Sequence, residues 1–127
     1  MNRTPRAMAL AAVCLTLGVS AIAGTLNSPM MFADNNGEAR RLFCSAVNVG
    51  TGPIASVTVS IVDQLGNALA TNTCTSLAAN QFCGAGTSPS TFLLRGHCSI
   101  TGSGTFRAAV NVDDANFNTI AVMPFSK

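Results

Sequence analysis

The chain has 127 residues, of which 48% are apolar and 9% are charged. Two of its seven basic residues, Arg3 and Arg6, lie near the N-terminus, so the other five balance the five acidic residues. A neutral chain without a cluster of Lys or Arg lacks the electrostatic footprint of proteins that bind nucleic acid or anionic membranes. Low surface charge also gives little protection against self-association, so the composition favours an oligomer or a protein partner.

The N-terminus has the pattern of a secretory signal peptide. Arg3 and Arg6 precede an apolar run over residues 7–19, and Ala21-Ile22-Ala23 is a small-residue cleavage motif. We therefore expect residues 1–23 to form a signal helix that is removed after Ala23. An uncleaved anchor is less favoured, because the apolar run is shorter than the roughly 17 to 25 residues of a membrane span. Export places the rest of the chain in the periplasm or outside the cell, with no membrane contact after cleavage.

Residues 24–40 are predicted to form a flexible N-terminal arm. Asn and Pro residues in this segment surround one apolar patch, Met30-Met31-Phe32. Residues 41–127 are then a single domain, because the length left after cleavage suits one modest core.

The segment after Arg41 has an all-β pattern of short apolar or alternating runs between turn residues. Ser56 to Asp63 is the clearest strand, and Gln64–Asn67 supplies a hairpin turn. Gly84–Ser90 is predicted to be a flexible break, and Gly102–Gly104 a tight turn within a second hairpin. The expected strands are 42–49, 56–63, 68–75, 91–101, 105–112 and 119–125. Six or seven strands are typical of a two-sheet antiparallel sandwich.

Four cysteines remain after the leader is removed, an even set that indicates disulfides in an exported domain. Cys44 and Cys98 share strand parity with apolar neighbours, so both are expected to face the core. Cys74 and Cys83 lie close together in sequence and suit a local bridge. Of the three possible connectivities, we predict Cys44 with Cys98 and Cys74 with Cys83.

The sequence offers little for catalysis or metal binding. No paired Cys-x-x-Cys zinc motif occurs, and His97 and Cys98 are strand neighbours that point to opposite faces. Asp113, Asp114 and Asn116 could offer oxygens to calcium, but they do not follow a calcium-loop spacing and are common turn residues. We therefore predict no catalytic residues, no cofactor and no metal site.

The run Cys44-Ser45-Ala46-Val47-Asn48-Val49-Gly50, the Pro53-Ile54 pair and the Val57–Asp63 strand with Gly66-Asn67 resemble a known kind of protein. They are similar to small exported bacterial immunoglobulin-like β-sandwich proteins of unassigned function. The resemblance implies an immunoglobulin-like antiparallel sandwich and an exported location. It implies no activity.

The expected function is therefore that of a non-enzymatic binding or structural protein. One alternative is a small secreted hydrolase or hydrolase inhibitor whose working residues lie on the 76–81 or 84–90 loops. Turnover that is lost when His97 or Asp114 is changed would favour this alternative. A second is a subunit of a surface polymer, in which the 24–40 arm is donated as a strand to a neighbour.

Overall fold

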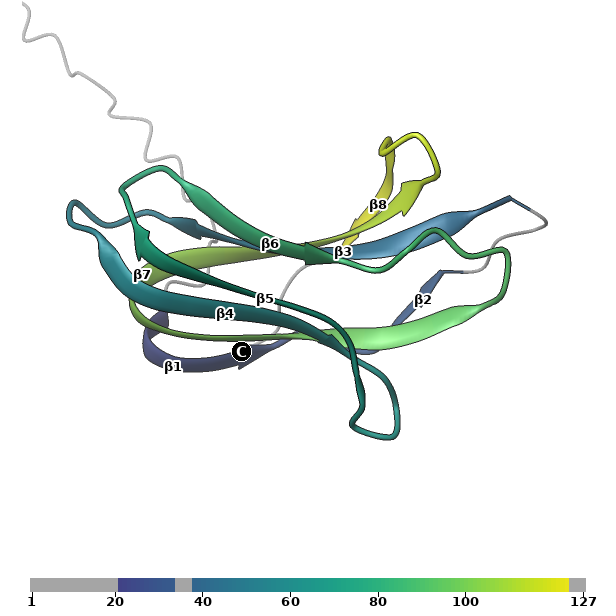
Figure 1. Ribbon diagram of the computed structural model, residues 1–127, viewed down its shortest axis with the longest axis horizontal. Helices are drawn as coiled ribbons and strands as arrows, with labels where there is room; N and C mark the ends of the chain where they lie inside the picture. The colour runs from purple at the N-terminus through teal and green to yellow at the C-terminus, as the bar shows by residue number, and fades with distance from the viewer. Residues whose placement is uncertain (1–20, 34–37, 124–127) are drawn as a thin grey trace, which may run out of the picture.

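The computed structural model describes residues 21–33 and 38–123. The predicted signal helix lies almost entirely outside these residues. The described part of the chain is all-β, as the sequence predicted, with strands joined by turns and short loops (Figure 1). None of its segments is a helix long and apolar enough to cross a membrane.

Eight strands make up the described fold, and every pairing between them is antiparallel. Their bounds are β1 Ala21–Asn27, β2 Met31–Ala33, β3 Arg40–Asn48, β4 Ile54–Val62, β5 Ala68–Leu77, β6 Phe82–Gly86, β7 Leu94–Asp114 and β8 Thr119–Met123.

The 21-residue strand β7 organises the sheet. The hydrogen-bonded path runs β5-β4-β7-β3-β6, and β1, β2 and β8 also pair with β7. Residues 97–102 of β7 pair with β4, and residues 106–114 pair with β3. Residues 99–106 pair with β1, so β1 lies on the edge of β7 opposite to β4 and β3.

The predicted hairpin turn at Gly102–Gly104 is wrong. The two halves of β7 do not pair with each other but with β4 and β3. Figure 1 shows β7 running along one layer, bending near its middle and returning along the other layer. Gly104 allows this bend, because its φ is 119° and a Cβ there would lie 2.9 Å from Cγ1 of Ile54. Bent strands that change layer in this way form the corners of sandwiches and barrels.

The core lies between the two layers and is lined by alternate residues of each strand. On β7 the even-numbered residues stay inward on both sides of the bend, and Cys98, Ile100, Phe106 and Val110 are fully buried. The same parity on both sides of the glycines is the sequence signal for one continuous strand. Phe92 lies within the predicted 91–101 strand and has the same parity, but in the structure it precedes β7 and is 81% exposed.

Two segments expected to be irregular contain strands. The 24–40 segment holds most of β1 and all of β2, whose Met31 and Ala33 are buried in the core. Gly84–Gly86, expected within a flexible break, belongs to β6 and pairs with Cys44, Ser45 and Phe43 of β3. Each segment forms a strand because a strand from another part of the chain supplies partners for its backbone hydrogen bonds. The local sequence does not reveal that partner.

The disulfides in the structure are Cys44–Cys98 and Cys74–Cys83, the pairs expected from strand parity and spacing. Cys44–Cys98 joins β3 to the first half of β7 across the buried core. Cys74–Cys83 joins β5 to β6, the two ends of the hydrogen-bonded path. Since the Asn72 side chain also donates to the Gly84 carbonyl (2.8 Å), the two layers are closed into a nearly barrel-like shape along this side.

Candidate functional site

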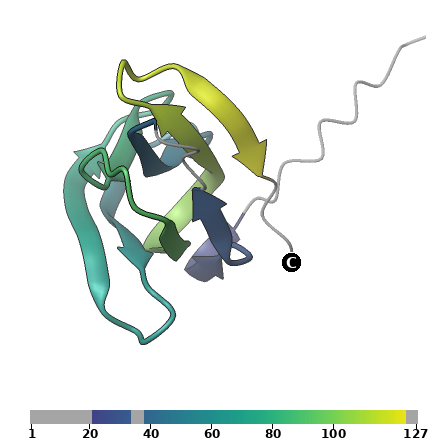
Figure 2. The ribbon, with the colours of Figure 1, turned by 90° about the vertical axis from the view of Figure 1, so that its right-hand side faces the viewer.

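An open groove of about 260 Å³ lies at the end of the molecule where β4 turns into β5 and where β7 begins. Figure 2 shows this end facing the viewer. Three segments form the groove: the 63–67 turn, the start of β5, and residues leading into β7. Its lining residues are Asp63, Gln64, Leu65, Leu69, Leu93, Leu94 and Arg95.

The groove is apolar because leucines from all three segments face solvent there. Leu65 is 79% exposed, and Leu69 and Leu93 are also exposed. Phe92, next to Leu93 in the chain, adds another exposed apolar side chain. A groove lined by apolar side chains with a few polar groups is a candidate binding site.

Two charged side chains, Asp63 and Arg95, line the groove. The Arg95 guanidinium lies 5.6 Å from the centre of the Phe32 ring, and no carboxylate of the described residues forms an ion pair with it. Asp63 also lines the groove, but its oxygens accept hydrogen bonds from Leu65 N (2.8 Å), Asn67 N (2.8 Å) and Asn67 Nδ2 (3.1 Å). Of the two, Arg95 is the one whose side chain forms no hydrogen bond or ion pair within the described part of the chain.

The hydrogen bonds from Asn67 lower the pKa of Asp63, the backbone N–H of Asn67 being the largest cause. A carboxylate that accepts several N–H donors is stabilised in its charged form. Asp63 thus holds the turn that presents Leu65 to solvent.

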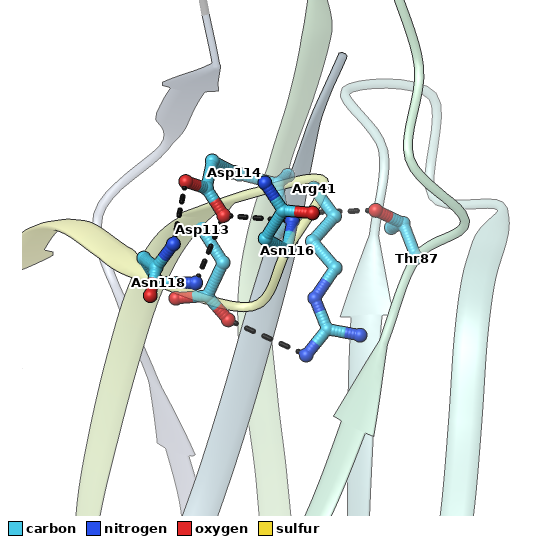
Figure 3. A network of polar contacts seen from close by, with 7 residues as sticks. Arg41, Thr87, Asp113, Asp114, Asn116 and Asn118 are labelled. Carbon is cyan, nitrogen blue, oxygen red and sulfur yellow. Dashed lines mark hydrogen bonds and ion pairs between the residues drawn. The ribbon is translucent and has the colours of Figure 1, made fainter.

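A polar cluster lies at the C-terminal end of β7, where the chain turns into β8 (Figure 3). The Arg41 guanidinium donates to Asp113 at 3.4 Å, and these side chains are 16% and 5% exposed. It also lies 3.9 Å from the Phe117 ring centre and 5.4 Å from that of Phe43. Nε of Arg41 and Oδ1 of Asp113 are buried without a hydrogen-bond partner.

Asp114 anchors the turn next to this cluster. It accepts hydrogen bonds from Asn116 N (2.8 Å), Asn118 N (2.9 Å) and Asn118 Nδ2 (2.9 Å). The Asn118 side chain is the largest cause that lowers the pKa of Asp114. Asp113 faces Arg41 instead, so the residues considered as calcium ligands are engaged in an ion pair and a turn.

The structure does not bring the other candidate residues together. Within the described residues, no hydrogen bond or ion pair joins His97 to Asp114: His97 pairs with Val62 of β4, and Asp114 lies in the other half of β7, which pairs with β3. Cys98 is bonded to Cys44, so it is not a partner thiol for His97. No three His, Cys, Asp or Glu side chains within residues 21–33 and 38–123 are grouped as metal ligands.

Sequence reasoning missed the groove and one buried polar residue. Leu65 within a turn and the run Phe92-Leu93-Leu94, which puts apolar side chains on both strand faces, were the available signals for the groove. Asn48 is fully buried, and its side chain donates to Gly52 O and Leu77 O and accepts from Gly50 N. Asn48 therefore fixes two loops at the other end of the molecule, a structural role.

The fold and these features define a small, all-β, disulfide-bonded protein with an apolar groove at one end. The sequence matches no known protein family, and no curated protein or solved structure is significantly similar to it.

Proposed function

We propose that this chain is an exported, non-enzymatic binding or structural protein of the periplasm or extracellular space. In this proposal residues 1–23 are a cleaved signal peptide, and the mature chain is an immunoglobulin-like sandwich that works through surface contacts. The two disulfides support the compartment, because disulfides persist in oxidising environments and are rare in the cytosol.

The groove is the observation that carries the binding role. Its exposed leucines would lose contact with water when a partner covers them, and apolar burial contributes about 25 cal/mol per Å². The hydrogen bonds accepted by Asp63 hold the 63–67 turn on one side of the groove in place. A site formed beforehand loses less conformational entropy on binding than a flexible one.

The chemistry of the groove selects one kind of partner. Leucine side chains suit an apolar segment, and Arg95 suits a carboxylate, since arginine pairs with carboxylates through two parallel hydrogen bonds. We therefore assign to the groove a partner protein with a short apolar segment that ends in, or carries, a carboxylate.

Site-specific photo-crosslinking in the native host tests this assignment. A photoreactive residue replaces Leu93 in the groove, and a matched variant carries it at Phe82, which is also exposed but lies on β6 outside the groove. We expect an adduct at position 93 that is absent at position 82. Mass spectrometry should place the crosslink on an apolar peptide with an acidic residue or a C-terminal carboxylate.

The purified partner then gives the decisive measurement. We expect Arg95→Gln and Leu65→Ser each to weaken its binding by about tenfold or more, the loss expected for one charge-assisted hydrogen bond or one buried side chain. Phe82→Ser should leave the affinity unchanged. Equal adducts at positions 93 and 82, or binding that is insensitive to Arg95→Gln, would contradict the proposal.

A further inference from the structure

Strand β1 spans the expected cleavage site. Ala21 pairs with Phe106 and Ile22 with Thr105, whereas Gly24 to Asn27 pair with residues 102 to 99 of β7. The Ala23–Gly24 peptide bond therefore has hydrogen-bonded strand on both sides. The register is irregular between Ile22 and Gly24, so this bond also lies at a bulge, and the φ of Gly24 is 154°.

The part of β1 after the cleavage site is held firmly. Leu26 is half-buried against the core, and the exposed Thr25 hydroxyl lies 2.9 Å from that of Thr101. Ser28 follows β1 and is buried, where its N–H donates to the Cys98 carbonyl (2.9 Å) and its hydroxyl accepts from Cys98 N–H (2.8 Å). These contacts fix β1 beside a half-cystine of the Cys44–Cys98 disulfide.

A protease needs its substrate as a free, extended segment, so a bond inside a sheet is cut only when that region opens. Signal peptidase would have to bind Ala21 to Gly24, and three of these residues, Ala21, Ile22 and Gly24, pair with β7. We propose that the folded chain protects its own Ala23–Gly24 bond, so that the leader can be removed only before β1 pairs with β7. This inference rests on the proposed export through residues 1–23.

The reaction is a hydrolysis in which water supplies both new ends. The C–N bond of Ala23–Gly24 breaks, the oxygen of water joins the Ala23 carbonyl carbon to form a carboxylate, and both hydrogens of water pass to the Gly24 nitrogen, which becomes a protonated amine. Because the bulge separates the two parts of β1, cleavage leaves the Gly24–Asn27 ladder in place. It removes the β1 partners of Thr105 and Phe106 and so uncovers that stretch of the β7 edge.

The test compares the full chain in two states. The oxidised, folded precursor and the reduced, urea-unfolded precursor are each incubated with signal peptidase in detergent, and mass spectrometry follows the appearance of an N-terminal Gly24. A model substrate checks that the protease stays active in the same urea. We expect the folded precursor to be cut at least about tenfold more slowly, which corresponds to an opening free energy of about 1.4 kcal/mol or more.

Two matched variants assign the protection to β1. Leu26→Asp places a charge on the half-buried face of β1 and should make the folded precursor cleavable at a rate near that of the unfolded chain. Asn27→Asp adds the same charge one residue away on the exposed face of β1, and its cleavage should match that of the folded wild type. If Leu26→Asp does not fold, the comparison of wild-type states still decides the question.

The outcomes separate the two proposals. Equal cleavage rates for the folded and unfolded precursors would overturn the protection by β1. The proposal that residues 1–23 are a signal peptide would still stand. Failure to cut the unfolded precursor at Ala23–Gly24 would instead overturn the proposed leader, and this inference with it.

Discussion

Two turns of this protein have the same hydrogen-bond design but carry different kinds of residue at the position with positive φ. Asp63–Asn67 joins β4 to β5, and Asp114–Asn118 joins β7 to β8. In each turn the aspartate accepts from the backbone N–H two and four residues later and from the side chain of the closing asparagine. In each, the aspartate N–H also donates to the asparagine carbonyl at 2.9 Å.

The difference is the residue with positive φ. The first turn has Gly66 at φ 86°, and the second has Phe117 at φ 67°. A bulky residue in this region costs roughly 1–2 kcal/mol relative to glycine. Phe117 is 64% exposed, yet its ring lies 3.9 Å from the Arg41 guanidinium. The comparison indicates that a cation–π contact offsets the strain in the second turn, while the first turn avoids the strain with glycine.

Arg41→Ala should give the largest loss of stability, because Arg41 supports the second turn. It removes the contact to Phe117 and leaves the Asp113 carboxylate, whose side chain is 5% exposed, without its ion-pair partner. We expect a loss of about 3 kcal/mol in the free energy of unfolding, as for other broken buried pairs. Chemical denaturation measures this loss.

Arg95→Ala is the matched control for that change, because Arg95 also stacks on a phenylalanine but is exposed and has no ion pair with a described carboxylate. Its effect should stay within about 0.5 kcal/mol. Similar losses for both variants would show that Arg41 has no special role in the second turn.

Gly66→Phe places a phenylalanine at the positive-φ position of the first turn, as in the second turn. No heavy atom lies within 4 Å of a Cβ built at Gly66, so the cost comes from the positive φ alone. We expect a loss of about 1–2 kcal/mol in the free energy of unfolding. Gly52→Phe is the control, since Gly52 has equally open space without a positive φ, and it should change stability little.

Phe117→Gly sharpens the comparison from the other side. Glycine relieves the strain of the positive φ, but it also removes the cation–π contact with Arg41. Because these two effects oppose each other, we expect the single variant to change the free energy of unfolding by less than about 0.5 kcal/mol. In an Arg41→Ala background the same change should stabilise the protein by about 1 kcal/mol. A double-mutant cycle by chemical denaturation gives the coupling. Equal effects in both backgrounds would rule out compensation by Arg41.

Strand parity made the all-β class, the first turn and the inward positions of Cys44 and Cys98 readable from the sequence. These features depend on a few adjacent residues. The bend in β7 was missed because Gly102-Ser103-Gly104 suits a hairpin turn as well as a corner. Which of the two forms depends on β3 and β4, which pair with the halves of β7 from distant parts of the chain.

The groove was not predictable for a related reason. Its lining comes from a turn, a strand start and a loop end that meet only in the folded chain. Arg41 and Phe117 show the same limit, because nothing local indicates that a phenylalanine takes a positive φ beneath a distant arginine. The sequence shows apolar residues in predicted turns, but it does not show which of them lie next to one another in the folded chain.

The smallest expected difference between the turns concerns their titration. Both aspartates have a pKa lowered from 3.8, but the largest cause is the backbone N–H of Asn67 for Asp63 and the side chain of Asn118 for Asp114. Alanine keeps a backbone N–H and removes the side chain. Asn118→Ala should therefore raise the pKa of Asp114 more than Asn67→Ala raises that of Asp63, as measured by NMR titration of the carboxyl carbons.

The same shifts predict how stability depends on pH. Because the folded pKa is below the unfolded value, the stabilisation by each aspartate is complete above the ordinary pKa and is lost as the pH falls through the lowered folded value. In acid denaturation Asn118→Ala should flatten this dependence more than Asn67→Ala does. An equal effect of the two variants would mean that the side-chain bond matters no more in the strained turn than in the relaxed one.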